Sequence, residues 1–447
     1  MTNAFQTLTR RTLTCVLAFA LIGASAAEAR TYTVNDRTDH APDGCTAADC
    51  TLREAVIAIN ARKGPDTIVL PSRKPYQLSI ASTGEDKAAN GDLDIRSGPL
   101  TIVHPGKGTA TIDANKTDRV FDIGKAKTTL EKLTIRGGFT HKADGDGDGG
   151  GILTGDFGNA PLTILRSRIV DNRAPWVGAP GGGIDSDNSS LVTLVDSEVS
   201  NNDSGGNGGG IEGSPDGQLL IQRTKIISNK GAQAGGLMVF GPPAKIFDST
   251  IAYNSAAAGP SVEGDGGGIY VGTKGRVELT NSTIASNGAY TSGGGIFLDA
   301  GSQANILYTT IARNRADADR KFGGTTGGIH LRTAGVRVAA NARVNNSVIA
   351  LNTEAGGVGA DCGGLGFLGA GINLISTKNQ GTCSTVEPLV AANPLLGPLA
   401  RNGGRTPTIA LLPGSPAIGA AIPRRTPTRD QRGVKRVDPD LGAYERK

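Results

Sequence analysis

The sequence predicts an all-β protein wound into a right-handed parallel β-helix, with a short N-terminal capping α-helix. Three observations predict this fold: a short motif recurs along the chain, Gly pairs or triplets follow most of its copies, and large side chains are scarce. The 447 residues include 66 Gly, and only 4% are aromatic. Because Gly is about 1 kcal/mol less favourable than Ala inside a helix, this composition argues against a helical bundle. Charged residues amount to 19%, and Ile, Val and Leu are plentiful, which argues against a disordered chain.

The recurring motif reads apolar-x-apolar-x-x-[Ser/Thr]-x-[Ile/Val]-x-x-Asn and occurs in seven copies between Leu162 and Asn352, after a degenerate copy at Leu130. Every copy except the last is followed by Gly residues and an apolar-x-apolar strand. These strands start at Ile184, Ile211, Leu237, Ile269, Ile296 and Ile329. Alternate side chains of a strand share one face, and strands this short bury that face only by stacking repeat on repeat. Since parallel crossovers are right-handed, we expect a right-handed coil.

The polar positions of the motif are expected at the corners of the coil. Stacked Asn side chains at a corner can hydrogen-bond to one another in a ladder. The expected ladder contains Asn172, Asn202, Asn229, Asn254, Asn287, Asn314 and Asn352. We interpret the Gly residues as turn residues that supply positive φ, and not as phosphate-binding loops.

The N-terminal end of the coil needs a cover, because an exposed sheet edge invites polymerisation. Thr51-x-x-Glu54 is a capping box that opens a short helix. Its apolar residues fall on one face and suit a plug: Leu52, Ala55, Val56 and Ile59. We therefore divide the chain into a signal peptide (1–29), an N-terminal cap (30–64), the parallel β-helix (65–355) and a C-terminal cap with a basic tail (356–447).

The first residues have the pattern of an export signal. Arg10 and Arg11 precede an apolar run over 15–22, and Ala27-Glu28-Ala29 fits a cleavage site, so we expect cleavage after Ala29. Sec export is favoured, although residues 9–13 loosely resemble a twin-arginine signal. No later segment approaches the roughly 20 apolar residues that span a membrane. The mature protein is therefore expected outside the cytoplasm: extracellular, at the cell surface or periplasmic.

Four cysteines remain after removal of the signal: Cys45, Cys50, Cys362 and Cys383. An even number in an oxidising compartment favours two disulfides. The simplest pairing joins Cys45 to Cys50 and Cys362 to Cys383. A zinc site is the alternative, disfavoured because the two pairs lie far apart in the sequence and have no local His partner.

Three segments resemble known families. Cys50-Thr51-Leu52-Arg53-Glu54-Ala55 is similar to the CSLREA motif of exported bacterial proteins, with Thr51 in place of Ser. The alternation of Gly-Gly-x-Ile with Ile-x-x-Asn resembles the repeats of polymorphic outer-membrane proteins. Residues 393–445, with Gly442-Ala443-Tyr444-Glu445, resemble the choice-of-anchor Q domain. These resemblances imply a pectate-lyase-like β-helix that is secreted or on the cell surface, and they imply no activity. The sequence departs from these families in that we expect neither their transporter barrel nor their sorting tail.

Residues at one repeat position should form a column with a spacing of about 4.8 Å. The outward position after each Gly-Gly-x-apolar start holds Leu153, Asp185, Glu212, Met238, Tyr270, Phe297 and His330. Asp185 and Glu212 would then be neighbours, a spacing that suits a retaining glycosidase or a cation site. Tyr270, Phe297 and His330 would make an aromatic strip able to stack on sugar rings. The alternative is that these side chains merely fill the sheet surface.

Two further features point to ligands. Asp144, Asp146 and Asp148 alternate with Gly like the first half of a calcium loop. Gly155 stands where an EF-hand needs Glu, so the choice is between a partial calcium site and an acidic turn. Trp176, the only Trp, lies in one of the long insertions at 173–180, 255–265 and 315–326. Insertions at one corner of a solenoid usually mark a binding edge, which makes Trp176 a candidate ligand contact.

The formal charge of +5 is concentrated at the C-terminus, where residues 401–447 hold ten Lys or Arg against four Asp or Glu. The body lacks the basic stripe of a nucleic-acid binder. The tail is either a solvated surface or a contact with an anionic envelope or polymer. We expect a monomeric, adhesin-like protein that binds a polysaccharide or surface ligand without catalysis. The alternatives are a β-helical polysaccharide lyase or glycoside hydrolase that uses Asp185 and Glu212, and a structural envelope protein.

Overall fold

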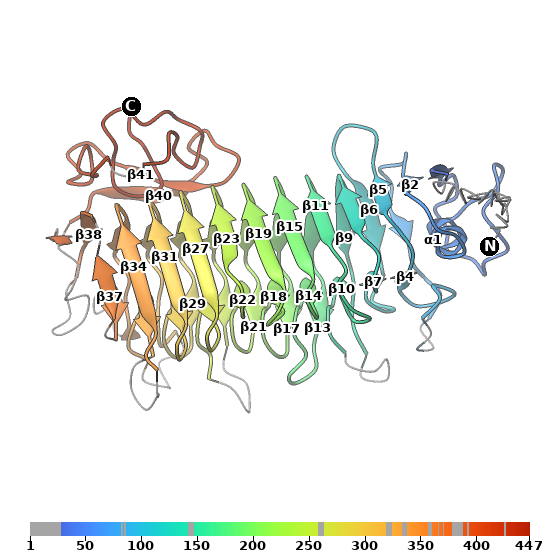
Figure 1. Ribbon diagram of the computed structural model, residues 1–447, viewed down its shortest axis with the longest axis horizontal. Helices are drawn as coiled ribbons and strands as arrows, with labels where there is room; N and C mark the ends of the chain where they lie inside the picture. Colours follow the sequence, from blue (N-terminus) through green and yellow to red (C-terminus); the bar gives the residue numbers. More distant parts are fainter. Residues whose placement is uncertain are drawn as a thin grey trace, which may run out of the picture.

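The computed structural model contains a long coil of stacked parallel strands (Figure 1). It describes residues 28–447 except 82–83, 85, 142–146, 258–262, 319–323, 333–337, 356–359, 365, 370, 378–387, 391–392 and 424–425. All strand pairs named below are parallel except β40–β41, and each coil contributes one strand to each of three long sheets. The protein is therefore a right-handed parallel β-helix, as the repeat predicts.

Sheet A has twelve strands. They are β1 (Arg30–Thr33), β2 (Asp66–Val69), β5 (Leu100–Val103), β8 (Thr128–Glu131), β11 (Leu162–Leu165), β15 (Leu191–Val195), β19 (Gln218–Gln222), β23 (Ala244–Phe247), β27 (Arg276–Thr280), β31 (Gln303–Leu307), β34 (Asn341–Asn345) and β37 (Phe367–Gly369).

Sheet B also has twelve strands. They are β3 (Tyr76–Gln77), β6 (Ala110–Asp113), β9 (Leu133–Arg136), β12 (Arg168–Val170), β16 (Glu198–Ser200), β20 (Lys225–Ile227), β24 (Thr250–Ala252), β28 (Thr283–Ala285), β32 (Thr310–Ala312), β35 (Val348–Ala350), β38 (Asn373–Ile375) and β39 (Pro388–Val390).

Sheet C has ten strands, and a short sheet D of five strands lies at the corner between B and C. Sheet C contains β4 (Leu93–Ile95), β7 (Phe121–Ile123), β10 (Ile152–Thr154), β14 (Ile184–Ser186), β18 (Ile211–Gly213), β22 (Leu237–Val239), β26 (Ile269–Val271), β30 (Ile296–Leu298), β33 (Ile329–Leu331) and β36 (Cys362–Gly363). Sheet D contains β13 (Arg173–Ala174), β17 (Asp203–Ser204), β21 (Lys230–Gly231), β25 (Ser255–Ala256) and β29 (Gly288–Ala289).

The interior is a continuous file of aliphatic side chains. Ile164 pairs with Leu194, and Leu194 pairs with Ile221, so equal positions of the motif lie on top of one another. All three side chains are fully buried and belong to one hydrophobic cluster. Burial of a Leu or Ile side chain contributes roughly 1.5–3 kcal/mol. This repeated burial holds successive coils together.

The expected Asn ladder runs unbroken along the corner between sheets B and C. The Nδ2 of each Asn donates to the Oδ1 of the next, at 2.9–3.0 Å, from Asn172 to Asn352. The same Oδ1 also accepts the backbone N–H of the preceding Asn. At the far end Asn352 donates to Asp361 Oδ1 at 2.9 Å. Asp361 cannot donate onward, and it accepts instead from the Ser376 hydroxyl and the Thr377 N–H.

Only part of the Gly interpretation is correct. In each Gly triplet only the first residue has positive φ, as in Gly208 at +58°, and Ala234 takes this position in one repeat at +57°. The last Gly is required for space: a Cβ on Gly210 would lie 2.5 Å from the Gly236 carbonyl oxygen and 3.0 Å from Asn229 Nδ2. Residues other than Gly adopt positive φ directly before each ladder Asn. They are Asp171, Asn201, Ser228, Tyr253, Ser286, Arg313 and Leu351.

The N-terminal cap contains helix α1 (Leu52–Asn60), which lies beside β2 and β4 at the end of the coil (Figure 1). The capping box is present, with the Thr51 hydroxyl and the Glu54 carboxylate each accepting the other residue's N–H. The four predicted apolar residues of the helix are buried in the main cluster. Arg53 is also buried, and it forms two hydrogen bonds to Asp39 at 2.7 and 3.1 Å.

Cys45 and Cys50 form the expected disulfide. Cys362 is also disulfide-bonded, and its predicted partner Cys383 lies outside the described residues. The signal-peptide segment falls outside them as well, apart from positions 28 and 29. In the part of the chain that is described, no helix has the length and hydropathy to cross a membrane.

The coil continues past residue 355, because β36, β37 and β38 pair in parallel with the preceding coil. Residues 393–447, here called the C-terminal unit, contain the antiparallel pair β40 (Leu396–Ala400) and β41 (Thr408–Leu411). This unit lies along the side of the coil (Figure 1). Its apolar residues cover outward side chains of sheet B in a second cluster. That cluster includes Ala285, Ala312, Val348, Ala350, Ile409, Leu411 and Leu441.

The close stacking at the ladder can be tested with two Ala substitutions. Gly210→Ala should lower the free energy of unfolding by about 2 kcal/mol, because the added methyl group collides with the next coil. Gly288→Ala is the matched control, since its Cβ would meet nothing closer than Ala318 Cβ at 3.6 Å. Urea unfolding of both variants measures the difference. Equal stability of the two variants would contradict the tight stacking.

Candidate functional site

The outward column predicted on sheet C is present. The strand register aligns Leu153 with Asp185, Asp185 with Glu212, and Glu212 with Met238. It continues through Tyr270, Phe297 and His330. The column also extends towards the N-terminus through Asp122 and Asp94, which the sequence analysis did not include because the motif is not recognisable there.

Most of the column is buried although it lies on the outer face of the sheet. Asp185 is 2% exposed and Phe297 2% exposed, while Glu212 and His330 are partly buried. Turns that follow the Asn ladder supply part of the cover. Ala234, for example, packs in one cluster with Met238 and the aromatic residues.

The aromatic strip exists, but its faces are occupied. The Tyr270 and Phe297 rings are stacked at 5.1 Å between centroids, and the Phe297 and His330 rings at 5.2 Å. Tyr270 donates its hydroxyl hydrogen to Asp299 at 3.0 Å, and the Arg332 guanidinium lies 5.2 Å from the Phe297 centroid. Burial and the charge of Arg332 lower the pKa of His330 to about 4. Near neutral pH the strip is therefore an uncharged, covered stack and does not offer an open platform.

A group of carboxyl side chains lies next to this stack. Asp185 and Glu212 are direct partners in the register. Burial, aided by the charges of Asp148 and Asp187 and opposed by a hydrogen bond with the Asn207 side chain, raises the pKa of Glu212 to about 8. Glu212 therefore holds a proton at neutral pH. A protonated carboxyl group can donate a hydrogen bond, or a proton, to an oxygen of a bound ligand.

Trp176 lies against the segment that leads into Asp148. Its indole N–H donates to the Thr140 carbonyl at 3.2 Å, and a Cβ on Gly147 would lie 3.1 Å from its Cδ1. Gly147 directly precedes Asp148. The indole is 40% exposed, and the next residue, Val177, is 72% exposed. The structure thus holds a partly open aromatic ring beside Gly147, the residue before Asp148.

The predicted calcium site comprises Asp144, Asp146 and Asp148. Asp144 and Asp146 lie outside the described residues, and Asp148 is the one member of the predicted trio within them. Asp148 acts on the pKa of Glu212, so it belongs to the same neighbourhood as the column.

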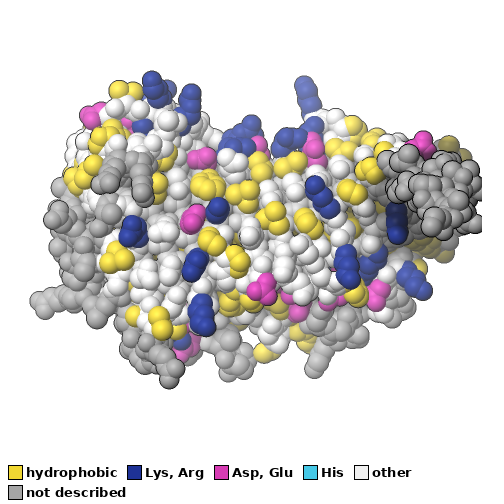
Figure 2. All heavy atoms as spheres, viewed as in Figure 1, with side chains coloured by type: hydrophobic (Ala, Val, Ile, Leu, Met, Phe, Trp, Pro, Cys, Tyr) yellow, Lys and Arg dark blue, Asp and Glu magenta, His cyan; other side chains and the backbone are white. Residues whose placement is uncertain are grey.

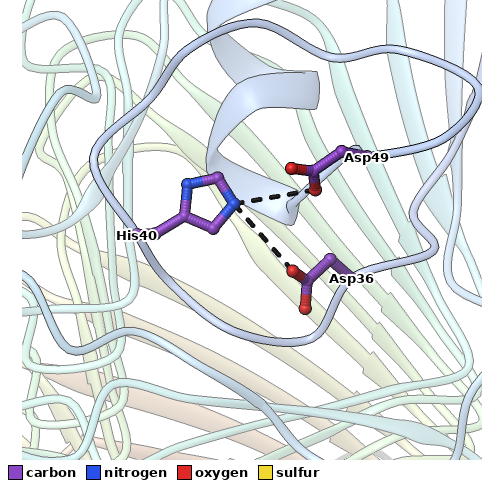
Figure 3. Close-up of side chains that lie close together, drawn as sticks. All are labelled: Asp36, His40 and Asp49. Atoms are coloured by element: carbon purple, nitrogen blue, oxygen red, sulfur yellow. Dashed lines mark ion pairs between the residues drawn. The ribbon is translucent and has the colours of Figure 1, made fainter.

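Two other acidic clusters, which sequence reasoning missed, already contain a basic side chain. Arg96 Nη2 lies 2.6 Å from Asp94, 2.9 Å from Asp122 and 3.4 Å from Asp86. In the N-terminal cap, His40 Nε2 lies 3.9 Å from Asp36 and 3.6 Å from Asp49 (Figure 3).

A hydrogen bond with the Ala41 carbonyl, together with the surrounding carboxylates, raises the pKa of His40. The Arg96 cluster is an internal ion-pair network, and the raised pKa of His40 favours its protonated form beside Asp36 and Asp49. Only the short spacing from Asp36 to His40 could have indicated the second cluster in the sequence.

Comparisons with known proteins agree with the fold. The family model described as "Right handed beta helix region" matches residues 204–384. Among solved structures, the crystal structure of pectate lyase Pel9A is similar, with a TM-score of 0.51 and 14% sequence identity. The alignment covers 95% of this chain and 98% of that one. No curated protein matches the sequence. At this identity the likeness to Pel9A shows a shared fold alone.

The protonated state of Glu212 has a measurable consequence for stability. Unfolded Glu titrates near 4.3, so between that pH and about 8 the folded protein binds more protons than the unfolded one. The free energy of unfolding of the wild type should therefore fall as the pH rises through this range. Glu212→Gln should lose this fall and be the more stable protein at pH 8.5.

Urea unfolding at a series of pH values measures the effect, with Glu278→Gln, a partly exposed residue of sheet A, as the control. If Glu212→Gln kept the pH dependence of the wild type, the conclusion that buried Glu212 is protonated at neutral pH would be refuted.

Proposed function

We propose that this is an exported β-helical binding protein that holds a polysaccharide or cell-surface glycan beside sheet C without cleaving it. The observation that carries the proposal is Trp176, a partly exposed indole held against the segment that leads into Asp148, whose charge raises the pKa of Glu212. Sugar rings stack on aromatic faces, and their hydroxyl groups need hydrogen-bond partners of both kinds. The oxygens of the Asp side chains supply acceptors, and protonated Glu212 supplies a donor.

The expected location of the ligand follows from which side chains near sheet C are buried and which are exposed to solvent. Tyr270 and Phe297 are buried, so the ligand would lie over the loops that cover them and not directly on the rings. The exposed pair Trp176 and Val177 belongs to the insertion between the Asn ladder and β14. Insertions on one side of a solenoid form its characteristic binding edge, which supports contact along several successive coils.

A second candidate function is cleavage of a polysaccharide at Asp185 and Glu212. The specific observation in its favour is a protonated carboxyl group directly beside a second carboxyl group in adjacent strands. Retaining glycosidases use such a pair about 5–5.5 Å apart, one as the acid and the other as the nucleophile. The name of the structural neighbour, a pectate lyase, adds acidic polysaccharides to the substrates worth testing.

Binding should be measured on a glycan array with residues 30–447. Trp176→Ala should weaken binding at least tenfold, because it removes the exposed ring. Tyr253→Ala is the matched control: this ring is 54% exposed but precedes a ladder Asn three coils away. Equal losses in the two variants, or no glycan bound by the wild type, would refute the proposed edge.

The same preparations should be assayed for reducing sugars and unsaturated uronides on acidic and neutral polysaccharides. The proposal expects binding without turnover. Turnover that Glu212→Gln and Asp185→Asn abolish would overturn the non-catalytic function and establish the second candidate.

A further inference from the structure

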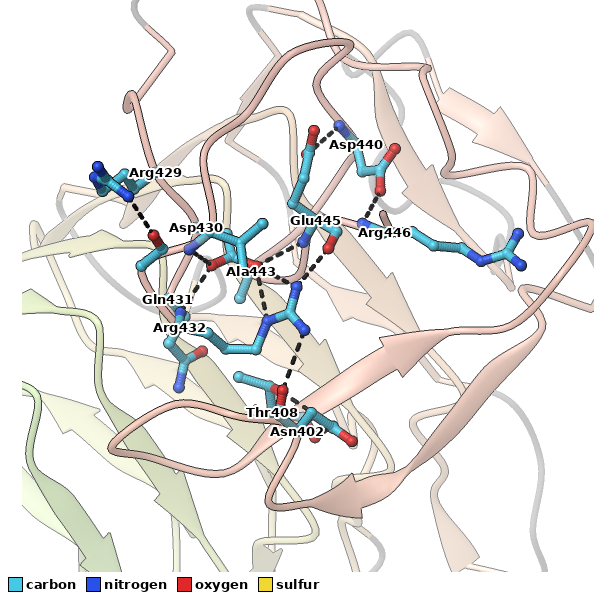
Figure 4. Close-up of polar contacts among 12 residues, drawn as sticks. Asn402, Thr408, Arg429, Asp430, Gln431, Arg432, Asp440, Ala443, Glu445 and Arg446 are labelled. Carbon is cyan, nitrogen blue, oxygen red and sulfur yellow. Dashed lines mark hydrogen bonds and ion pairs between the residues drawn. The ribbon is translucent and has the colours of Figure 1, made fainter.

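The basic residues of the C-terminal unit fall into two groups. Arg432 is internal and paired with Asp430 at 2.7 Å (Figure 4). Arg436 is also internal and is paired with Glu445 at 3.0 Å. The Arg432 guanidinium also lies over the Tyr444 ring, and the Arg436 guanidinium lies over the Tyr308 ring. These two bases stabilise the unit and are not available to a partner. The expectation of a uniformly solvated basic tail therefore does not hold for them.

Arg436 and residues around the two arginines attach the unit to the coil through hydrogen bonds. Gln431 donates to the Thr250 hydroxyl at 3.0 Å and accepts from the Thr283 hydroxyl at 2.6 Å. Arg436 donates to Asn281 Oδ1 at 3.3 Å, and the Ala443 N–H donates to the Thr310 hydroxyl at 3.0 Å. These contacts reach three successive strands of sheet B. The outer surface of the unit is thus held in one orientation relative to the rod.

The second group of bases is exposed. It contains Arg401, Arg405, Arg429, Lys435, Arg446 and Lys447. Within the described residues of the unit, Asp438 is the only exposed acid. Arg405 is paired with Asp196 of the coil at 3.4 Å. A few Lys and Arg side chains are visible at the upper left of the molecule, where the C-terminal unit lies (Figure 2). The outer surface of the unit is therefore strongly cationic.

Two of these bases are placed against each other. Arg429 and Lys435 are direct partners in an antiparallel bridge. Like charges directly opposite one another destabilise a β-pair, so the stability of the fold does not explain this choice of residues. An anionic partner would relieve the repulsion.

Exposed apolar side chains accompany these bases. Val437 is 83% exposed, and its N–H donates to Glu445, the neighbour of Arg446. Ile422 is 42% exposed and follows Ala421, whose N–H donates to the Pro439 carbonyl. We define the basic–apolar patch as Arg429, Lys435, Val437, Arg446 and Ile422.

We propose that the basic–apolar patch docks the protein onto an anionic phospholipid surface. Bases attract anionic headgroups, and apolar side chains gain by entering the boundary between headgroups and acyl chains. A soluble anionic polymer would engage the bases but would give Val437 no apolar environment. Lipid docking at one side of the rod leaves the Trp176 edge free, so the two surfaces can serve attachment and ligand binding separately.

Lys435→Glu separates docking from stability. The substitution turns the like-charge pair with Arg429 into an attractive one, so the melting temperature should stay the same or rise. Sedimentation with vesicles of phosphatidylcholine containing 30% phosphatidylglycerol should show about tenfold weaker binding than the wild type. Lys245→Glu, an exposed base on sheet A with the same change of charge, should bind like the wild type.

The apolar contribution is tested by Val437→Asp, which should weaken vesicle binding also at 0.5 M salt, where surface charges are largely screened. Neutral phosphatidylcholine vesicles should bind at least tenfold less wild-type protein. Equal binding to neutral and anionic vesicles, equal losses in Lys435→Glu and Lys245→Glu, or no vesicle binding would overturn the proposal. Binding to soluble polygalacturonate that Val437→Asp leaves unchanged, without binding to vesicles, would assign the patch to a polymer instead.

Discussion

The hydrogen-bonded ladder of Asn side chains is the constraint on which the rest of this structure depends. Each internal Asn accepts two hydrogen bonds at Oδ1 and donates two from Nδ2, one of them to a carbonyl of the preceding coil, as at Asn229. A buried amide without partners costs about 1–3 kcal/mol per group. A slip of one coil relative to the next would leave several such groups unsatisfied. The ladder therefore enforces, by hydrogen bonds, the same register that burial of the aliphatic face specifies.

The chemistry of sheet C follows from that register. Because Asp185 and Glu212 occupy one repeat position, their carboxyl groups must share one neighbourhood, and burial then keeps a proton on Glu212. The same register stacks Tyr270 on Phe297 and Phe297 on His330. A solenoid thus brings residues that are far apart in the sequence, such as Asp185 and Glu212, side by side on adjacent strands. The turns that cover the sheet then determine which of these side chains a ligand can reach.

The sequence predicted the features that repeat and missed those that depend on non-periodic contacts. The coil, the ladder, helix α1 and the alignment of Asp185 with Glu212 follow from period and spacing. The covering of Phe297 does not, because turns of variable length fold over it. Nothing in the sequence indicated that Asp361 ends the ladder, because this residue lies outside the repeat motif. The charge of Arg436 suggested solvent, yet Glu445 and Tyr308 bury it, a contact between segments far apart in the chain.

In-register stacking can be measured directly with paired cysteines on sheet A. Thr193 and Leu220 are direct partners on adjacent coils, whereas Gln222 pairs with Val195, two residues further along. The account predicts that Thr193→Cys/Leu220→Cys forms a disulfide under mild oxidation, detected by mass spectrometry of peptides, and that Thr193→Cys/Gln222→Cys does not. A disulfide in the second pair but not in the first would contradict the register and, with it, every column described above.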